Sequence, residues 1–598
     1  MTDFNKNKVQ NIRRSQFILT FGPGSIIESV NGPRLIPSLH TGLGKNFYYY
    51  ANKYEVPNIR MSYVIKNRDG NNSDEEVKFF TLPSNSSEGK LDNIGIYKTS
   101  IFPVWKICYG NHKNGSAILF DSSKHSECPE CGQKSKNHVR FICACPDGHL
   151  DEVPWFKSVH GNDSCNHFKD YFYWDGGNSL KDIVITCPVC KDKTNMGEIY
   201  SSQYHHCTGR FPEKENNEDF QNVSYSTPYY RKCSNVMRVI QRQSTSLRVS
   251  NNLTLIKIPK YERDVIKALQ WEDVKFLTID AIEDNYSKEK YLKKLARTKR
   301  SKAKKDIMSF IDQKSYDEFL EEATELYNGN YDMKNVLLQE FDSLNSGYQS
   351  EDDFEIAPSK EFTIKIQNKD FTFDVSSVNK IKTVTAQFGY QRKPYLKKED
   401  NAFVDPNIVD NGEKDRENEC IWYPVFEGTG EGIYITSDFN PIIELGLEDN
   451  ANEWLDNEPT FNSRGRDEVK NPLFVWWHSL SHALIRTLSF KSGYSAASIR
   501  ERVYVDLNTG KGGILLFTTT TGDDCSMGGL IEATDNFDEI LNDAFDSIKL
   551  CSYDPLCNST RISPEKVNGA ACIYCLLLPE TSCEHNNMWL DRHLLLGN

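Results

Sequence analysis

Three Cys-x-x-Cys pairs constrain this chain more than any other feature of its sequence: Cys128–Cys131, Cys187–Cys190 and Cys572–Cys575. Such a pair places two thiolates on one tight turn, so two elements of this kind can close a tetrahedral zinc site. The chain has 17 cysteines, and we expect no signal peptide because its first residues lack an apolar core. In a reducing compartment, metal binding is expected before disulfides.

Further ligand candidates near each pair predict two to three structural zinc ions. The predicted groupings are Cys128, Cys131, Cys145 and His149; then Cys187, Cys190, Cys207 and Cys233; then Cys557, Cys572, Cys575 and Cys583. Spacing leaves alternatives open: Cys143, His160 and Cys165 for the first site, and Cys551 for the third. The second and third groupings offer four cysteines each, and such closed sets stabilise folding rather than catalyse.

Two other interpretations of the cysteines are weaker. Free thiols are often buried as small apolar side chains, and this interpretation suits Cys108, Cys420 and Cys525, which stand alone. A redox role is typical of some Cys-x-x-Cys motifs. Additional Cys or His residues near each pair favour metal instead.

The length of 598 residues exceeds what one hydrophobic core supports, so a multidomain α+β protein is expected, with zinc-ribbon-like modules and a compact α/β C-terminal domain. The predicted segments are a mixed N-terminal domain (1–125), a cysteine-rich zinc-binding module (126–260), a helical or mixed middle region with a basic run (261–400), a polar linker (401–420) and a zinc-binding C-terminal domain (421–598). The sequence suggests a cytoplasmic protein.

Apolar periodicity predicts amphipathic helices at 271–286, 315–327 and 537–550, and a buried helix at 472–490. Residues 502–507 and 513–521 read as two strands joined by a hairpin at 508–512. The stretch FGPGSII (21–27) lacks the residues of a phosphate-binding loop and is interpreted as a structural turn.

Known catalytic motifs are missing, so no catalytic residue is nominated and the chain is not expected to be an enzyme. His478 and His482 are four residues apart on the predicted helix and could bind a metal side by side. No HExxH glutamate accompanies them, and apolar neighbours such as Trp476 and Trp477 favour a role in the core or at an interface.

Two basic stretches are candidates for nucleic-acid contact in a chain whose formal net charge is −13. Residues 221–261 contain no Asp or Glu but several tyrosines, a pattern that suits phosphate neutralisation beside base stacking. The candidate contact residues there are Arg231, Lys232, Arg238, Arg242 and Arg248. Residues 288–305 hold ten Lys or Arg, for which a solvated surface is the favoured interpretation and nucleic-acid contact the alternative.

Specific motifs resemble a known family. Residues 478–504, 512–515, 528–532 and 551–592 resemble the zinc-binding C-terminal domain of MrfA-type helicases. With RRSQFILTFGPGSII (13–27), CPDGHLDEVPWFKSVH (145–160) and IQRQSTSLRVSNNLTLIKIP (240–259), most of the chain resembles the DrmB subunits of DISARM anti-phage systems. One departure is a polar Ser-Thr-Ser within 240–252, where a more apolar run is expected.

The resemblance implies a non-catalytic subunit that partners an SF2-type, DrmA-like helicase and contributes to DNA binding, without a membrane. It also implies a four-cysteine zinc site at Cys557, Cys572, Cys575 and Cys583. Two other functions stay open from the residues: a metal-dependent nuclease or hydrolase with an unrecognised site, and an adaptor that binds only protein.

Overall fold

The computed structural model describes residues 10–67, 75–84, 95–161, 165–166, 170–201, 205–215, 233–257, 260–269, 271–298, 300–327, 333–347, 354–395, 406–415, 419–458, 467–520, 529–564, 566–579 and 581–597. The chain divides into two compact units. Unit 1 comprises residues 1–57, 78–253 and 385–426, and unit 2 comprises 58–77, 254–384 and 427–598. The predicted α+β class with several domains is confirmed.

Unit 1 consists mainly of short strands. Its helices are α1 (Arg14–Leu19), α2 (Leu39–Leu43), α3 (Phe47–Lys53), α5 (Trp155–His160) and α6 (Met196–Ser201). Its strands are β1 (Ile26–Ser29), β2 (Gly32–Leu35), β4 (Ser100–Ile101), β5 (Trp105–Cys108), β6 (Ala117–Asp121), β7 (Asn137–His138), β8 (Phe141–Ala144), β9 (Leu150–Asp151), β10 (Tyr171–Asp175), β11 (Val184–Thr186), β12 (Lys193–Asn195), β13 (His205–His206), β14 (Val236–Gln241), β19 (Val409–Asp410) and β20 (Glu413–Asp415).

Three sheets organise most of these strands. The strand orders are β1-β2-β4, β12-β11-β10-β6-β5-β7 and β13-β14-β8-β9. Pairing within the last two sheets is antiparallel. Because antiparallel strands can be joined by short loops, the cysteine-rich connections lie close together at the strand ends. Aromatic side chains such as Trp155, Phe172 and Trp174 fill the core between them.

A buried arginine joins distant segments of unit 1. The fully buried guanidinium of Arg392 donates to Glu213 at 3.1 Å and to the carbonyl oxygens of Gly24, Gly148 and Leu247. Gly24 has φ +83°, and a Cβ there would lie 2.6 Å from the ring of Tyr390. Glycine is therefore required in the FGPG turn, as its structural interpretation predicts.

Unit 2 combines a sheet with many helices. Its helices are α4 (Ile59–Asn67), α7 (Lys260–Leu269), α8 (Glu272–Glu283), α9 (Lys288–Leu295), α10 (Ser301–Gln313), α11 (Tyr316–Tyr327), α12 (Met333–Asn345), α13 (Pro441–Glu444), α14 (Glu448–Asp456), α15 (Pro472–Lys491), α16 (Gly529–Glu532), α17 (Phe537–Lys549) and α18 (Arg592–Leu596). Its own strands are β16 (Phe354–Ile356), β17 (Lys360–Ile366), β22 (Arg500–Asp506) and β23 (Lys511–Thr520).

Four further strands contain a boundary between the units: β3 (Glu76–Thr81), β15 (Val249–Ile256), β18 (Lys369–Gln391) and β21 (Cys420–Ser437). Within unit 2 the strand order is β18-β21-β23-β22, and β22 pairs antiparallel with β23 from Arg500↔Phe517 to Asp506↔Lys511. The predicted hairpin is confirmed. Helix α15 packs on this hairpin and on α17 and α18.

Helix α15 confirms the predicted buried helix. The side chain of Asn471 caps its N-terminus by accepting from the amide of Leu473 at 2.9 Å, and Pro472 occupies the first turn, where its missing N–H costs nothing. The side chains of Trp476 and Trp477 are fully buried on different sides of the helix. The helix is buried on nearly every side because it lies inside the core rather than on it, and its buried residues include the polar His478, Ser481 and His482.

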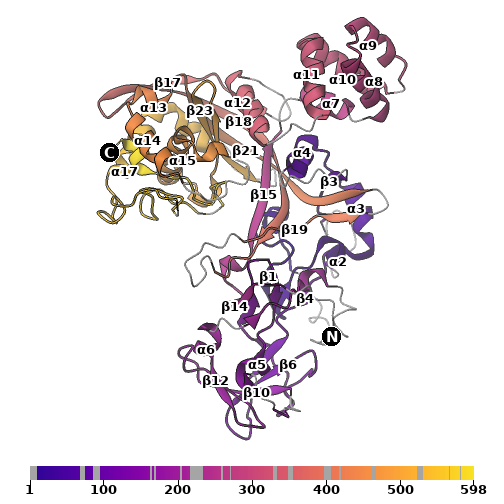
Figure 1. The fold of residues 1–598 in the computed structure, drawn as a ribbon, viewed down its shortest axis with the longest axis vertical. Helices are drawn as coiled ribbons and strands as arrows, with labels where there is room; N and C mark the ends of the chain where they lie inside the picture. The colour runs from indigo at the N-terminus through magenta and orange to yellow at the C-terminus, as the bar shows by residue number, and fades with distance from the viewer. Residues whose placement is uncertain are drawn as a thin grey trace. The chain divides into compact units, whose positions relative to one another are not determined.

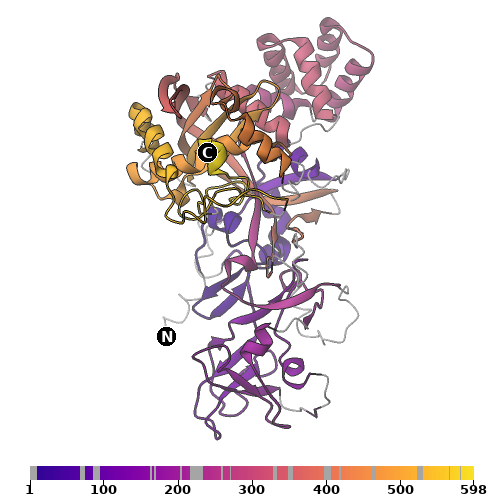
Figure 2. The same cartoon turned by 60° about the vertical axis from the view of Figure 1, so that its left-hand side comes forward.

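Helices α7 to α11 pack against one another, with α10 against α7 and α9 against α8 (Figure 1). Figure 2 shows the same helices gathered together from a second side. The predicted helices at 271–286 and 315–327 are confirmed as α8 and α11, and that at 537–550 as α17. Among the described residues, no helix is long and apolar enough to cross a membrane.

The five contiguous segments predicted from the sequence do not coincide with the two units, which alternate along the chain. Within the predicted polar linker 401–420, the described residues include β19 and β20, which pair with β18 and β21. Polar composition hid these strands because they are short and lie at sheet edges. The five-segment division otherwise stays a prediction.

Candidate metal centres

Five groups of Cys, His or Glu side chains come together among the described residues, each with four ligand atoms within 4.8 Å of one another. Four are sulfur-rich: Cys108, His112, Cys128 and Cys131 (group A); Cys145, His149, Cys207 and Cys233 (group B); His160, Cys165, Cys187 and Cys190 (group C); Cys551, Cys557, Cys572 and Cys575 (group D). The fifth, group E, consists of His478, His482, Glu501 and Cys583.

Group A forms where β5 ends and where the loop between β6 and β7 turns. The thiols of Cys108 and Cys131 lie 3.6 Å apart, and Nε2 of His112 lies 3.4 Å from Sγ of Cys128. Gly132, directly after the Cys-x-x-Cys pair, has φ +71°, and its amide donates to the carbonyl of Cys128. This tight turn directs both thiols of the pair to one centre.

Group B forms beside the sheet of β8, β9, β13 and β14. Sγ of Cys145 lies 3.2 Å from Nδ1 of His149 and 3.5 Å from Sγ of Cys207. The hydrogen bond from the Cys207 thiol, together with His149, lowers the pKa of Cys145 to about 5 despite its burial. The site therefore stabilises a thiolate, which is the form that binds metal.

Group C couples the pair Cys187–Cys190 to the end of α5. The thiols of Cys165 and Cys187 lie 3.9 Å apart, and the amide of Val189 donates to Cys187 at 3.4 Å. His160 is oriented by a 2.9 Å hydrogen bond between its Nδ1 and the carbonyl of Phe156. A histidine held in this way can offer its other nitrogen as a metal ligand.

Group D is the four-cysteine group. The thiol of Cys551 lies 3.3 Å from that of Cys572, and Cys557 lies 3.7 Å from Cys575. The amide of Tyr553 donates to Cys551 at 3.4 Å and that of Cys572 to Cys575 at 3.2 Å. Four thiols supported by amide donors match a closed, structural zinc site.

The structure corrects the predicted groupings. Every predicted metal ligand lies in one of the five groups, but Cys145 and His149 join Cys207 and Cys233 rather than Cys128 and Cys131. The reason is strand pairing. Because β14 pairs with β8 and β13 pairs with β14, Cys233, Cys207 and Cys145 arrive at the same end of one sheet.

Two further expectations were wrong. Cys108 was interpreted as a lone buried thiol, yet it belongs to group A. Its signal was present in the sequence, since Cys108-x3-His112 repeats the spacing of Cys145-x3-His149. The four-cysteine site takes Cys551 as its fourth member instead of Cys583, which lies in group E. His160, Cys165 and Cys551 had been considered only as alternatives.

The predicted nucleic-acid residues of 231–248 are mostly engaged inside unit 1. Arg231 and Lys232 lie outside the described residues. Arg242 pairs with Glu28 at 2.8 Å and also donates to the carbonyls of His138 and Val139.

Arg248 donates to the carbonyls of Pro23 and Thr20, and burial lowers its pKa to about 9. Arg238 lies over the ring of Tyr395, 4.8 Å from its centroid. These contacts indicate that Arg242 and Arg248 stabilise the fold of unit 1.

The basic run of 288–305 is the more accessible cationic surface. It lies on α9, α10 and the connection between them, and its exposed cations are Lys288, Lys290, Lys293, Arg297, Arg300, Lys302 and Lys305. The guanidinium of Arg300 lies 3.9 Å from the ring centroid of Trp271, whose side chain is 45% exposed. The Arg300 cation and an exposed aromatic ring therefore lie side by side.

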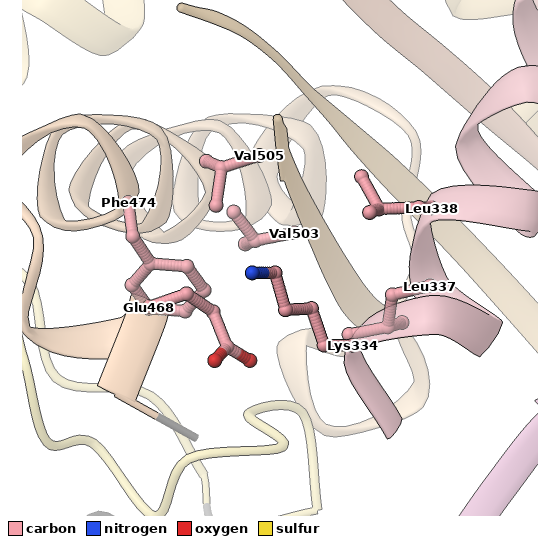
Figure 3. A pocket seen from close by; sticks show the side chains of 7 residues that line it. All are labelled: Lys334, Leu337, Leu338, Glu468, Phe474, Val503 and Val505. Carbon is pink, nitrogen blue, oxygen red and sulfur yellow. The ribbon is translucent and has the colours of Figure 1, made fainter. Parts of the chain in front are cut away.

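A hollow of about 280 Å³ lies in unit 2, and Figure 3 shows the side chains that line it. They are Lys334, Leu337, Leu338, Glu468, Phe474, Val503 and Val505. Most of this space is open to solvent, and the enclosed part is about the size of one water molecule, far too small for a typical organic ligand. Its mostly aliphatic walls contain none of the five metal-ligand groups, so it is not an obvious catalytic centre.

Comparison with known proteins agrees with these centres. Residues 480–576 match the MrfA Zn-binding domain, and residues 13–249 match a domain of unknown function, DUF8724. Over 507 residues the chain is 27% identical to the DISARM protein DrmB of Bacillus paralicheniformis, covering 79% of this chain and 82% of that protein. The resemblance to DrmB is confirmed. All of group D lies within the zinc-domain match, and groups A, B and C lie within the DUF8724 match.

The expected cofactor is therefore supported on two grounds. The chain contains a match to a zinc-binding domain, and several of its Cys/His groups are consistent with structural zinc. The DrmB-like chain offers more such groups than the two to three predicted from spacing. The residues of group D would hold the zinc of the C-terminal domain.

Proposed function

We propose that this chain is a non-catalytic, zinc-stabilised subunit of a DISARM-type phage-restriction complex. It acts in the cytoplasm, partners an SF2-type, DrmA-like helicase and contributes to DNA binding. The observation that carries this proposal is the similarity to DrmB over most of both chains. In this proposal the zinc sites stabilise the fold and take no part in catalysis.

The composition of groups A to D supports a non-catalytic role. A catalytic zinc keeps an open position for water or substrate, whereas each of these groups brings four protein ligands to one centre. We expect the purified chain alone to show no ATPase activity. Metal-dependent nuclease or hydrolase activity of the isolated chain is the competing function, and its detection would overturn the non-catalytic assignment.

An exposed apolar surface beside group D supports a protein partner. Its members are Leu550, Tyr553, Leu556, Ile573 and Tyr574, which are between 49% and 84% exposed. The rings of Tyr553 and Tyr574 lie 6.1 Å apart. Apolar patches of this kind mark interaction sites on soluble proteins, so we assign this surface to the helicase.

The partner assignment is tested by co-purification of this chain with a co-expressed DrmA-like SF2 helicase. Ile573→Asp with Tyr574→Asp should abolish co-purification, because two charges would be buried in an apolar interface. Zinc content should stay at the wild-type value, since neither side chain belongs to group D. Phe276→Asp, a change at another exposed aromatic (59% exposed), is the matched control and should leave the complex intact.

The basic face of α9 and α10 supports DNA contact. Its cations would neutralise phosphates and release counterions, so affinity should fall as salt rises. Trp271, beside Arg300, can stack on a base, as aromatic side chains do in single-strand binding. Residues 288–305 thus replace 231–248 as the main candidate surface, while Arg238 stays a candidate.

The DNA assignment is tested on the assembled complex. Lys293→Glu, Arg297→Glu and Lys302→Glu together should weaken DNA binding roughly tenfold or more and reduce the salt slope by about three, uniformly across sequences. The control is an equal charge change at the exposed Lys113, Lys134 and Lys136. Unchanged affinity in the test variant would indicate an adaptor role for this chain, with DNA held by the helicase alone.

A further inference from the structure

Group E brings four ligand-type side chains from three distant segments to one buried point. Helix α15 supplies His478 and His482, strand β22 supplies Glu501, and the C-terminal segment supplies Cys583. His478, His482 and Glu501 are fully buried, and Cys583 is 6% exposed. Their ligand atoms lie within 4.8 Å of one another.

The hydrogen bonds of the two histidines fix which nitrogens face the centre. Nδ1 of His478 lies 3.1 Å from the carbonyl of Trp589, and Nδ1 of His482 lies 2.7 Å from the carbonyl of Leu576. A carbonyl only accepts, so each Nδ1 carries the proton. In neutral imidazoles each Nε2 then offers a lone pair, and this arrangement is typical of metal-binding histidines.

Those lone pairs converge on other acceptors. Nε2 of His478 lies 2.8 Å from Oε1 of Glu501 and 3.3 Å from Sγ of Cys583, and Nε2 of His482 lies 3.2 Å from the same carboxylate oxygen. Facing acceptors inside a protein need a cation between them, either a shared metal ion or a proton on each imidazole. One metal ion satisfies all of these atoms together, whereas protonation of both imidazoles would bury two cations that share a single carboxylate oxygen.

The second oxygen of Glu501 and the sulfur of Cys583 are also supported. The hydroxyl of Ser481 donates to Oε2 of Glu501. The amides of His585 and Asn587 each donate to Sγ of Cys583 at 3.3 Å. Amide donors of this kind also reach sulfurs of groups B, C and D, so Cys583 shares the environment of the thiolates there.

The charge and spacing of the group fit a divalent ion. Two neutral imidazoles, a carboxylate and a thiolate carry two negative charges, which one divalent ion neutralises, so that the buried site is electroneutral. Tetrahedral zinc with bonds of about 2.0–2.3 Å gives ligand-to-ligand edges of about 3.3–3.6 Å. The contacts of 2.8, 3.2 and 3.3 Å lie within about half an ångström of these edges.

We infer that His478, His482, Glu501 and Cys583 form a second metal site of the C-terminal domain, separate from group D, that binds zinc. Nitrogen, oxygen and sulfur donors in a tetrahedral set suit zinc among the common divalent metals. With four protein ligands, all of them buried, the site is structural: it ties helix α15, strand β22 and the C-terminal segment together. The inference does not depend on the proposed function.

The first test counts metals in the intact full-length chain by native mass spectrometry. The variant carrying Glu501→Gln and Cys583→Ser should contain one zinc fewer than the wild type. The matched control is Glu431→Gln, a buried glutamate on β21 that accepts from Tyr494 and from the amide of Leu530 outside group E. The control should keep the wild-type count. Equal counts in the folded double variant and the wild type would overturn the inference.

The second test uses the wild-type chain, so it does not depend on how the variant folds. Zinc is replaced by cadmium-113 and the nuclear magnetic resonances are recorded. Groups A to D offer three or four sulfurs each, whereas group E offers one. A separate resonance, far upfield of the sulfur-rich set, is expected from a site with one sulfur, two nitrogens and one oxygen. Resonances confined to the sulfur-rich range would overturn the inference.

Discussion

Arg502 and Glu340 form an ion pair inside unit 2 in which Nη1 of the arginine donates to both carboxylate oxygens, at 3.1 and 2.9 Å. Both side chains are 1% exposed. The hydroxyl of Tyr504 and the amide of Ile256 also donate to Glu340. The pair therefore fastens α12 and the end of β15 to the hairpin of the C-terminal domain.

Arg502→Ala should lower the free energy of unfolding by about 3–5 kcal/mol, because it leaves a buried carboxylate without its partner. Urea denaturation at constant zinc measures this change. Lys511→Ala breaks the exposed 2.6 Å pair with Asp438 and should change stability by less than about 1 kcal/mol. Equal effects of the two substitutions would contradict the assigned importance of the buried pair.

Cys575→Ser should remove the zinc of group D and unfold the C-terminal domain, with or without a partner protein. Zinc binding in such sites supplies folding energy, on the order of 10–16 kcal/mol in small domains. Soluble yield, metal content and protease resistance report the loss. Cys143→Ala, at a buried cysteine outside the five groups, should retain full metal content; metal loss in this control would show that the assay reports general damage.

Glu152 should make stability depend on pH in a defined window. Burial raises the pKa of this carboxyl from 4.5 to about 8, although it accepts from the amide of Val104 at 2.6 Å. The ionised form is disfavoured in the fold, so stability is full below pH 4.5 and falls as pH rises towards 8.

Glu152→Gln stays neutral and keeps the acceptor oxygen. Its stability advantage over the wild type should therefore grow between pH 5.5 and pH 8 by a few kcal/mol, about 1.4 kcal/mol for each unit of pKa shift. Denaturation at several pH values measures the free energy of unfolding of both proteins. Their zinc sites are the same, so any effect of pH on metal binding is common to both. An advantage that does not change with pH would show that the carboxyl is already ionised throughout.

Arg248→Met should destabilise unit 1 by about 1–3 kcal/mol, because the carbonyls of Thr20 and Pro23 lose their donor inside the fold. The DNA affinity of the complex assembled with this variant should equal that of the wild-type complex. Thermal unfolding and a binding titration separate the two effects. A loss of DNA affinity at unchanged stability would instead return this arginine to the phosphate-contact surface.

Local patterns in the sequence predicted the local elements well. The apolar run of 472–490 and the alternation around NTGKG specify helix α15 and the β22–β23 hairpin because period and turn chemistry act over a few residues. The metal groups were harder. The type of each ligand could be read from the sequence, but its partners depend on strand pairings such as β14 with β8, which join residues about a hundred positions apart.

Group E shows the same limit more sharply. His478 and His482 were visible as a helical pair, and Cys583 as part of a terminal cluster, yet Glu501 carried no local signal of metal binding. Only the packing of β22 against α15 places its carboxylate beside both imidazoles. Tertiary packing, rather than spacing, decides which cysteines share a centre.

The alternation of the two units along the chain has a consequence for the order of synthesis. Unit 1 takes its last segment from residues 385–426, and unit 2 takes an early one from residues 58–77. A ribosome must therefore deliver well over half of the polypeptide before either unit has all its parts. Until then the thiols of groups A, B and C belong to a nascent chain in which unit 1 is still incomplete. The supply of zinc during translation, and not only after it, should therefore determine how much native protein a cell obtains.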